Sequence, residues 1–287
     1  MYKLLNAGFS RLMKNKIFWG IVIITIIIAL GLVLNRISSS GFFENEIEPV
    51  LTNYILFIGF FIAIFTSLFV GTEYSDGAIR NKIVVGHTRK NIYLSNLIIS
   101  IAVGLFIEFV YLILVMIIGI PTLGGLQIPI DKFLFILLDM ILIVVAYSSI
   151  FNFITLMCSD ITIATVACIL VFIGMFVVSE FVVSPIANDK KYYSNYVTNE
   201  NGEVIETQKH LNPNYVGDFA KQVYKNILYI IPSGQASQIQ STMSNLSYEN
   251  DRYMTDTDIK LAGLYSLGLI IVINGIGIYF FKRKDLK

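Results

Sequence analysis

The sequence predicts an all-α integral membrane protein with six transmembrane helices. Of its 287 residues, 55% are hydrophobic and only 14% are charged, which is too little charge to cover the surface of a soluble domain of this length. A hydrocarbon core about 30 Å thick needs about 20 helical residues, and six apolar runs are long enough. These runs are Ile17–Leu34, Tyr54–Val70, Leu97–Ile120, Phe133–Cys158, Ile161–Val183 and Leu261–Phe281.

The distribution of Lys and Arg predicts the orientation of the chain. With the N-terminus inside, the short outer loops carry only Arg36 and Lys132, and the first of them also holds Glu44, Glu46 and Glu48. Because cytoplasmic loops are enriched in cations, we expect both termini to be cytoplasmic. The cations on that side are Lys3, Arg11, Lys14, Lys16, Arg80, Lys82, Arg89, Lys90, Lys282, Arg283, Lys284 and Lys287.

Residues 2–16 have the pattern of an amphipathic helix. Leu5, Phe9, Leu12 and Met13 share one face, and the opposite face is polar, with Lys3, Asn6, Ser10 and Lys14. This spacing predicts an interfacial helix that lies on the inner leaflet with its cations toward anionic headgroups. The alternative is a frayed basic segment that serves orientation alone.

A long polar segment, residues 184–260, separates the fifth and sixth spans. Asn201-Gly202 lies between β-prone residues and predicts a hairpin. After Pro213, apolar residues recur at helical spacing up to Pro232, which predicts an amphipathic helix. We therefore divide the chain into residues 1–183 (interfacial helix and five spans), a small α+β extracellular cap at 184–260, and the last span with its basic cytoplasmic tail at 261–287.

The sequence gives little support to an enzyme. It has no phosphate-binding loop of the G-x-x-x-x-G-K-[ST] type. The two histidines, His87 and His210, are assigned to opposite sides of the membrane, and no His, Cys or carboxylate cluster has metal-ligand spacing. We expect no catalytic residue, metal or cofactor in this chain, and no basic, aromatic stretch predicts nucleic acid binding.

The cytoplasmic loop between spans two and three, residues 71–93, is longer and more charged than a simple connection needs. Its "YSDGAIRNKIVV" predicts one or two helical turns with Ile79, Ile83 and Val84 on a shared face. A short amphipathic helix with charges around it suits docking into a groove on a soluble partner. The alternative is a solvated loop that only fixes topology. We expect Glu73 to be a rim charge near the headgroups, with a mild effect on removal.

The pattern Glu73-x-x-x-Gly77-x-Ile79, followed by Arg89 near the start of the third span, resembles the ABC-2 type permease family. "LYIIPSGQ", residues 228–235, is similar to the short motif that precedes the sixth span in that family. Two positions differ. Ala78 stands where the family has Thr or Ser, and Ser95-Asn96 stands where many members have Lys.

The resemblance implies that residues 71–93 form a coupling helix that docks onto an ATP-binding cassette subunit. ATP and Mg²⁺ would then be bound by that partner, present in two copies. Two six-span halves, here two copies of this chain, would surround a shared pathway in a bacterial plasma membrane. The residues expected to couple the subunits are Glu73, Asp76, Gly77, Ile79, Arg80, Lys82, Ile83 and Arg89.

Two carboxylates within the spans, Glu108 and Asp139, are candidates for the substrate pathway. A carboxylate facing lipid is costly, so each should face protein or a water-filled cavity, where it offers a negative path to a cationic amphipath. The alternative is a purely structural, protonated or hydrogen-bonded role.

Size and the large last outer loop resemble Gram-positive exporters of antimicrobial or toxic peptides, such as the phenol-soluble-modulin exporter. Ions, drugs and lipid-linked substrates stay open as cargo. A sensor or scaffold that docks a signalling partner stays open as a function.

Overall fold

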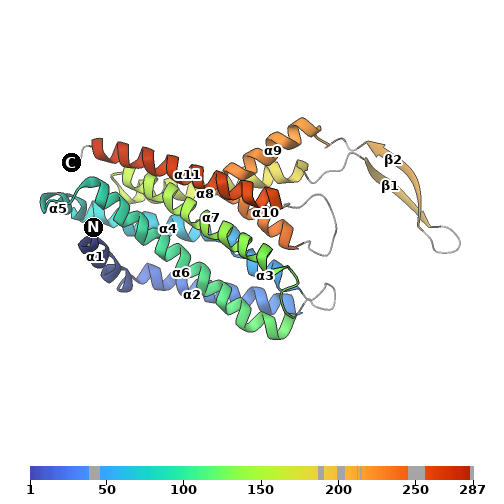
Figure 1. Ribbon diagram of the computed structural model, residues 1–287, viewed down its shortest axis with the longest axis horizontal. Coiled ribbons are helices and arrows are strands. Elements are labelled where there is room, and N and C mark those ends of the chain that lie inside the picture. The colour runs from blue at the N-terminus through green and yellow to red at the C-terminus, as the bar shows by residue number, and fades with distance from the viewer. Residues whose placement is uncertain are drawn as a thin grey trace.

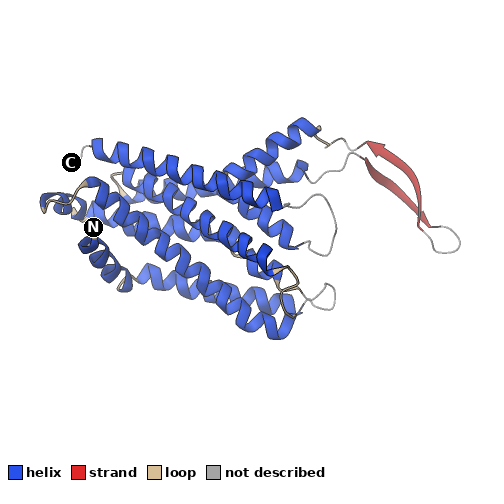
Figure 2. Ribbon diagram, viewed as in Figure 1, coloured by secondary structure: helices blue, strands red, loops and turns tan. Residues whose placement is uncertain are grey.

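The computed structural model describes residues 1–38, 46–186, 191–198, 204–211, 213, 215–244 and 256–284. Its helices form one elongated bundle, and a two-stranded hairpin extends from one end of it (Figure 2). The N-terminus, the end of α11 (Asp256–Arg283) and the short helix α5 (Ala78–Val84) lie together at the opposite end (Figure 1). We call these two ends the hairpin end and the α5 end.

Six helical segments among the described residues are long and apolar enough to cross a membrane, as the sequence predicts. They are α2 (Lys16–Ser38), α3 with α4 (Glu48–Asn53 and Ile55–Ser75), α6 (Arg89–Leu123), α7 (Ile130–Met157), α8 (Ile161–Ile186) and α11. The bundle is therefore that of an all-α multi-pass membrane protein.

The core of the bundle lies where α4, α6 and α7 meet. Large aromatic side chains fill it, including Tyr54, Tyr111 and Tyr147, and all three are buried. Tyr54 stacks on Tyr111 with ring centroids 4.6 Å apart. Helices α2, α8 and α11 lie toward the outside, and most of their side chains are exposed or only half-buried. Such exposure is what a lipid environment permits.

The predicted interfacial helix is present as α1 (Tyr2–Met13), which packs against α6. Leu4 and Leu12 are buried, whereas Phe9 and Met13 are exposed. The apolar face predicted from the sequence is therefore divided between the bundle and its surroundings. Exposed Phe9 and Met13 are the side chains that a membrane surface would cover.

The segment between the last two spans contains β1 (Lys191–Thr198) and β2 (Val204–Leu211), which pair antiparallel with irregular register around Asn195. The hairpin that the sequence predicts is thus present, although Asn201-Gly202 lies outside the described residues. The predicted amphipathic helix is α9 (Asp218–Ile230).

A second helix, α10 (Pro232–Ser244), follows at once and is largely buried against the bundle. The sequence pattern predicted that the preceding helix ends near Pro232, but not that a second helix begins there. Proline also opens helices well, because its missing N–H is not needed in the first turn.

Candidate functional site

The predicted coupling loop is not an open loop but a compact corner. Helix α4 ends at Ser75, the chain turns at Gly77, and α5 begins at Ala78. Gly77 has φ 65°, which is a left-handed conformation. Glycine adopts this conformation readily, whereas a residue with a Cβ would be strained in it. The second residue of the family-like pattern therefore has a physical role, which is to reverse the chain between the second span and α5.

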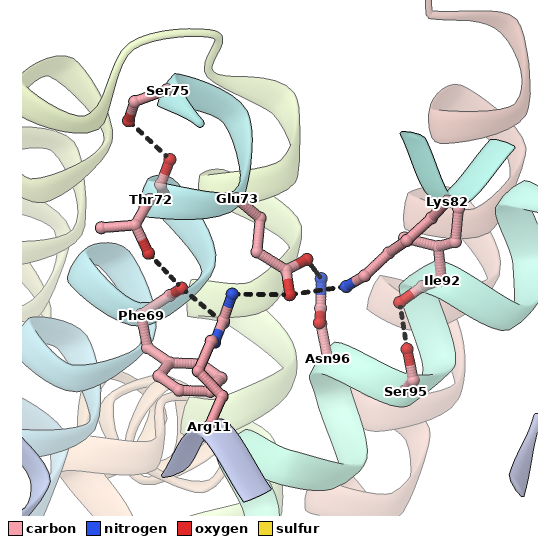
Figure 3. Close-up of polar contacts among 10 residues, drawn as sticks. Arg11, Phe69, Thr72, Glu73, Ser75, Lys82, Ile92, Ser95 and Asn96 are labelled. Carbon is pink, nitrogen blue, oxygen red and sulfur yellow. Dashed lines mark hydrogen bonds and ion pairs between the residues drawn. The ribbon is translucent and has the colours of Figure 1, made fainter. Parts of the chain in front are cut away.

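Glu73 lies inside this corner, 2% exposed, and not at a rim as the sequence suggested. Its Oε1 pairs with Arg11 Nη1 at 3.0 Å and with Lys82 Nζ at 2.5 Å. Its Oε2 accepts a hydrogen bond of 3.0 Å from Asn96 Nδ2 (Figure 3). We call these four residues the Glu73 cluster. It joins α1, α4, α5 and α6 through one carboxylate.

Arg11 is fixed on a second side, which makes the cluster rigid. Its Nη2 donates to the carbonyl of Phe69 at 2.9 Å, and its guanidinium lies 3.8 Å from the centroid of the Phe69 ring. Both groups are drawn in Figure 3. A planar guanidinium can bond a carboxylate and stack on a ring at once, which an ammonium group cannot do equally well. Helix α1 is thereby attached to the end of α4.

Ile79 differs from the expectation that it faces a partner, because it is only 1% exposed inside its own chain. Ile83, one turn later, is half-buried and packs on the same core. The exposed apolar side chains of this corner are instead Val84 and Val85, 80% and 77% exposed. Of the three residues predicted to share the docking face, Ile79 and Ile83 therefore pack inward and only Val84 is exposed, so the exposed apolar surface lies at the C-terminal tip of α5.

The remaining predicted coupling residues are also of two kinds, some exposed at the surface and some bonded to the bundle. Asp76, just before α5, and Arg80, one turn before Val84, are both exposed. Arg89 instead points back to the bundle. Its Nη1 donates to the carbonyls of Phe281 at 3.3 Å and Lys282 at 3.0 Å, and it also bonds the carbonyl of Lys284. Arg89 therefore caps the C-terminal end of α11 from the first turn of α6.

Lys284, which follows α11, caps the C-terminal end of α7 in the same way. The sequence did not predict this contact. Lys284 Nζ donates to the carbonyls of Met157 at 3.0 Å and Cys158 at 2.9 Å, and it bonds the Tyr74 hydroxyl at 3.2 Å. Burial lowers the pKa of Lys284 and raises the pKa of the Cys158 thiol. Because the carbonyls lie at a helix C-terminus, they offset part of the cost of burying the ammonium group.

The two predicted pathway carboxylates are inside the bundle but not together. Glu108 on α6 is 2% exposed, and Asp139 on α7 is 4% exposed. Asp139 lies against α11, because a Cβ added to Gly263 would be 2.8 Å from its Oδ1. Glu108 has no hydrogen-bond partner for either oxygen in the described part of the chain. No His, Cys, Asp or Glu group among the described residues is placed to hold a metal ion.

The motif "LYIIPSGQ" forms a second polar node, where α9, α10 and α11 meet. Gln235 donates through Nε2 to the carbonyls of Tyr229 and Ala262, and its Oε1 accepts from Ser266 Oγ at 2.7 Å. Ser233 shares a hydrogen bond of 2.7 Å with Ser179 of α8. The motif thus ties the segment that follows the hairpin to the last two spans.

The sequence pattern did not predict the contacts of Arg11, Asn96 and Lys284. It predicted only that Arg11 and Lys284 are cytoplasmic cations, and Asn96 stands out only as a difference from the family pattern. One signal was available, since a glutamate at the end of an apolar run needs partners, and basic residues at the same membrane depth are its natural ones.

The described chain is a polytopic helical bundle with a buried, charged corner at one end. Family comparison agrees, because the model described as ABC-2 family transporter protein matches residues 3–286. The chain therefore belongs to the ABC-2 family and is a transmembrane component of an ABC transporter, a class that works with an ATP-binding cassette subunit. Among curated protein sequences, none matches this chain.

Proposed function

We propose that this chain is the permease subunit of an ATP-driven exporter and that α5 receives the movement of the ATP-binding subunit. The Glu73 cluster is the observation that carries the proposal. A force applied to α5 reaches Glu73 through Lys82, and from Glu73 it reaches α1 through Arg11 and α6 through Asn96. A loop that only connected two spans would need no such junction.

The docking surface is the tip of α5. Val84 and Val85 present apolar area that would be covered by a groove, and the exposed Arg80 on α5 and Asp76 just before α5 supply charges of both signs. Apolar contact ringed by polar groups is how amphipathic helices bind grooves. Two copies of the ATP-binding subunit, each holding ATP and Mg²⁺, would engage two copies of this chain. The α5 end is then cytoplasmic, in a bacterial plasma membrane.

The cargo we propose is an amphipathic peptide, such as an antimicrobial peptide. Two features support this class. Glu108 and Asp139 provide buried acidic groups along the bundle, which suit a cationic face. An apolar groove of about 410 Å³ lies between α9 and the outer half of α11, where an apolar face could leave the bundle. Its lining residues are Ile230, Leu261, Leu264, Tyr265, Gly268, Leu269 and Val272.

The test of the docking surface is co-purification with the ATP-binding subunit. Replacing Val84 and Val85 with Asp removes two apolar contacts, each worth about 1.5–3 kcal/mol when buried, and should weaken the complex more than tenfold. Ser159→Asp is the matched control, since it adds a charge to an exposed turn at the same end, outside α5. Full binding by the valine variant, or equal loss in the control, would remove α5 as the docking element.

A further inference from the structure

Glu108 lies near the middle of the longest span, and no described group of the protein itself bonds its carboxyl oxygens. It belongs to α6, a helix that runs from Arg89 to Leu123. At 1.5 Å per residue, the side chain is roughly 20–30 Å from either end of that helix. Both carboxyl oxygens are buried, and neither has a hydrogen-bond partner in the described part of the chain. This is the least satisfied acid among the described residues.

The same chain treats its other deeply buried glutamates differently. Glu73 is paired with two cations and accepts from an amide. Glu48 accepts backbone N–H groups from Gln127 and Ile128. Charge-stabilising groups are therefore built around both of these carboxylates, and comparable groups are not placed around Glu108. A buried carboxylate without cations or donors is strongly disfavoured relative to the neutral acid.

The groups that face Glu108 from the helices packed around it are neutral. Tyr54, the residue just before α4, and Tyr111 of α6 lie beside it, and both hydroxyls are engaged elsewhere, Tyr54 with Thr25 at 2.7 Å and Tyr111 with the carbonyl of Val50. Helix α2 carries no titratable residue between Lys16 and Arg36.

Helix α7 carries two titratable groups at comparable depth, and neither is directed to Glu108. Asp139 lies against Gly263 of α11, and Tyr147 lies against Gly59 and Phe172. No described cation is therefore close enough to stabilise a charged Glu108.

We propose that Glu108 is a proton-binding site. It holds its proton while α2, α4 and α6 pack as they do here, and it releases the proton when the contact between these helices, here called the seam, opens to water. The ligand is a proton, bound as the neutral carboxylic acid. Opening the seam would hydrate the carboxylate and free the proton, and closing it would take a proton up again. The link to opening rests on the proposed function, whereas the bound proton in the closed state does not.

Infrared spectroscopy of the full-length chain in lipid nanodiscs tests the bound proton without nucleotide or cargo. A protonated carboxyl group has a C=O stretch that is separate from the bands of carboxylates. At pH 7, wild type should show this band, Glu108→Gln should lose it, and Asp139→Asn should keep it. An unchanged band in a folded Glu108→Gln variant would overturn the site.

Isotope labelling repeats the test on wild type, in case the variant does not fold. With ¹³C at the glutamate side-chain carboxyl, the protonated C=O band should shift, and with ¹³C-labelled aspartate the Glu108 band should not. Absence of any glutamate-dependent band at pH 7 would overturn the proposal.

Exchange into D₂O tests the link to opening. In the complex with the ATP-binding subunit, the band should exchange slowly at rest and at least tenfold faster during ATP turnover. Equal exchange with and without turnover would overturn the link and leave the static proton site. If the chain coupled to no ATPase at all, the resting band would still be present. Failure of the proposed function can therefore be distinguished from failure of the proton site.

Discussion

Arg89, in the first turn of α6, donates a hydrogen bond of 3.3 Å to the backbone carbonyl of Phe281, in the last turn of α11. The two residues are 192 positions apart in the chain. Together with the link from Lys284 to the end of α7, this contact joins the start of α6 and the end of α7 to the last span. Two of the cations that predict the orientation of the chain therefore also connect its helix ends.

Arg89→Met should loosen the end of α11. The variant removes charge-assisted bonds to terminal carbonyls, each typically worth about 1.5–3 kcal/mol, less where water can replace them. Amide hydrogen exchange over residues 281–284 should become faster. Lys90→Met is the matched control, because Lys90 is the exposed neighbouring cation, and it should leave exchange unchanged. Equal exchange in both variants would show that Arg89 does not hold the helix end.

Glu73→Gln should destabilise the protein strongly, contrary to the mild effect that a rim charge would give. Breaking a buried ion pair costs about 3–5 kcal/mol, and the partial exposure of Arg11 and Lys82 reduces this figure. The thermal transition in detergent should fall by several degrees. Asp76→Asn, an exposed acid three positions later, should change it little. A Glu73 variant as stable as wild type would contradict the cluster.

Gly277→Ala should separate α11 from α6, whereas Gly275→Ala should not. A Cβ at Gly277 would be 2.3 Å from the Tyr93 hydroxyl, and at Gly275 it would meet nothing within 4 Å. The clash falls on the group that bonds Asn274, so overpacking should cost about 1–3 kcal/mol. Thermal stability measured on the two alanine variants side by side gives the comparison. A more stable Gly277→Ala would mean that the helices are further apart than described.

Orientation can be checked by cysteine labelling in a background without Cys158 and Cys168. Ser75→Cys lies at the α5 end and Gln222→Cys on α9, and both positions are exposed. On intact cells, an impermeant thiol reagent should modify Gln222→Cys and spare Ser75→Cys. After membrane permeabilisation, both should react. The reverse labelling pattern would invert the topology.

The spans and the hairpin could be predicted because their signals are local. An apolar run of sufficient length needs no knowledge of its neighbours, and the β-prone residues around Asn201-Gly202 lie next to each other in the chain. The Glu73 cluster could not be predicted in this way, because Arg11 and Asn96 come from helices on either side in sequence. The prediction that Ile79 faces a partner was wrong for a similar reason. A seven-residue helix has two usable faces, and only packing on α4 and α6 decides which is buried.

The capping of α7 and α11 by Lys284 and Arg89 has a consequence for biosynthesis. Helix α11 is the last of the described helices to leave the ribosome, so Arg89 is inserted long before its carbonyl partners are made. Until then, the Arg89 guanidinium and the carbonyls of Met157 and Cys158 have only water and lipid headgroups to bond. The first five spans therefore form an assembly that is incomplete at its α5 end, and translation of Lys284 is the step that locks it. A ribosome stalled within α11 would leave a nascent protein with an unfinished α5 end, which quality-control proteases could recognise.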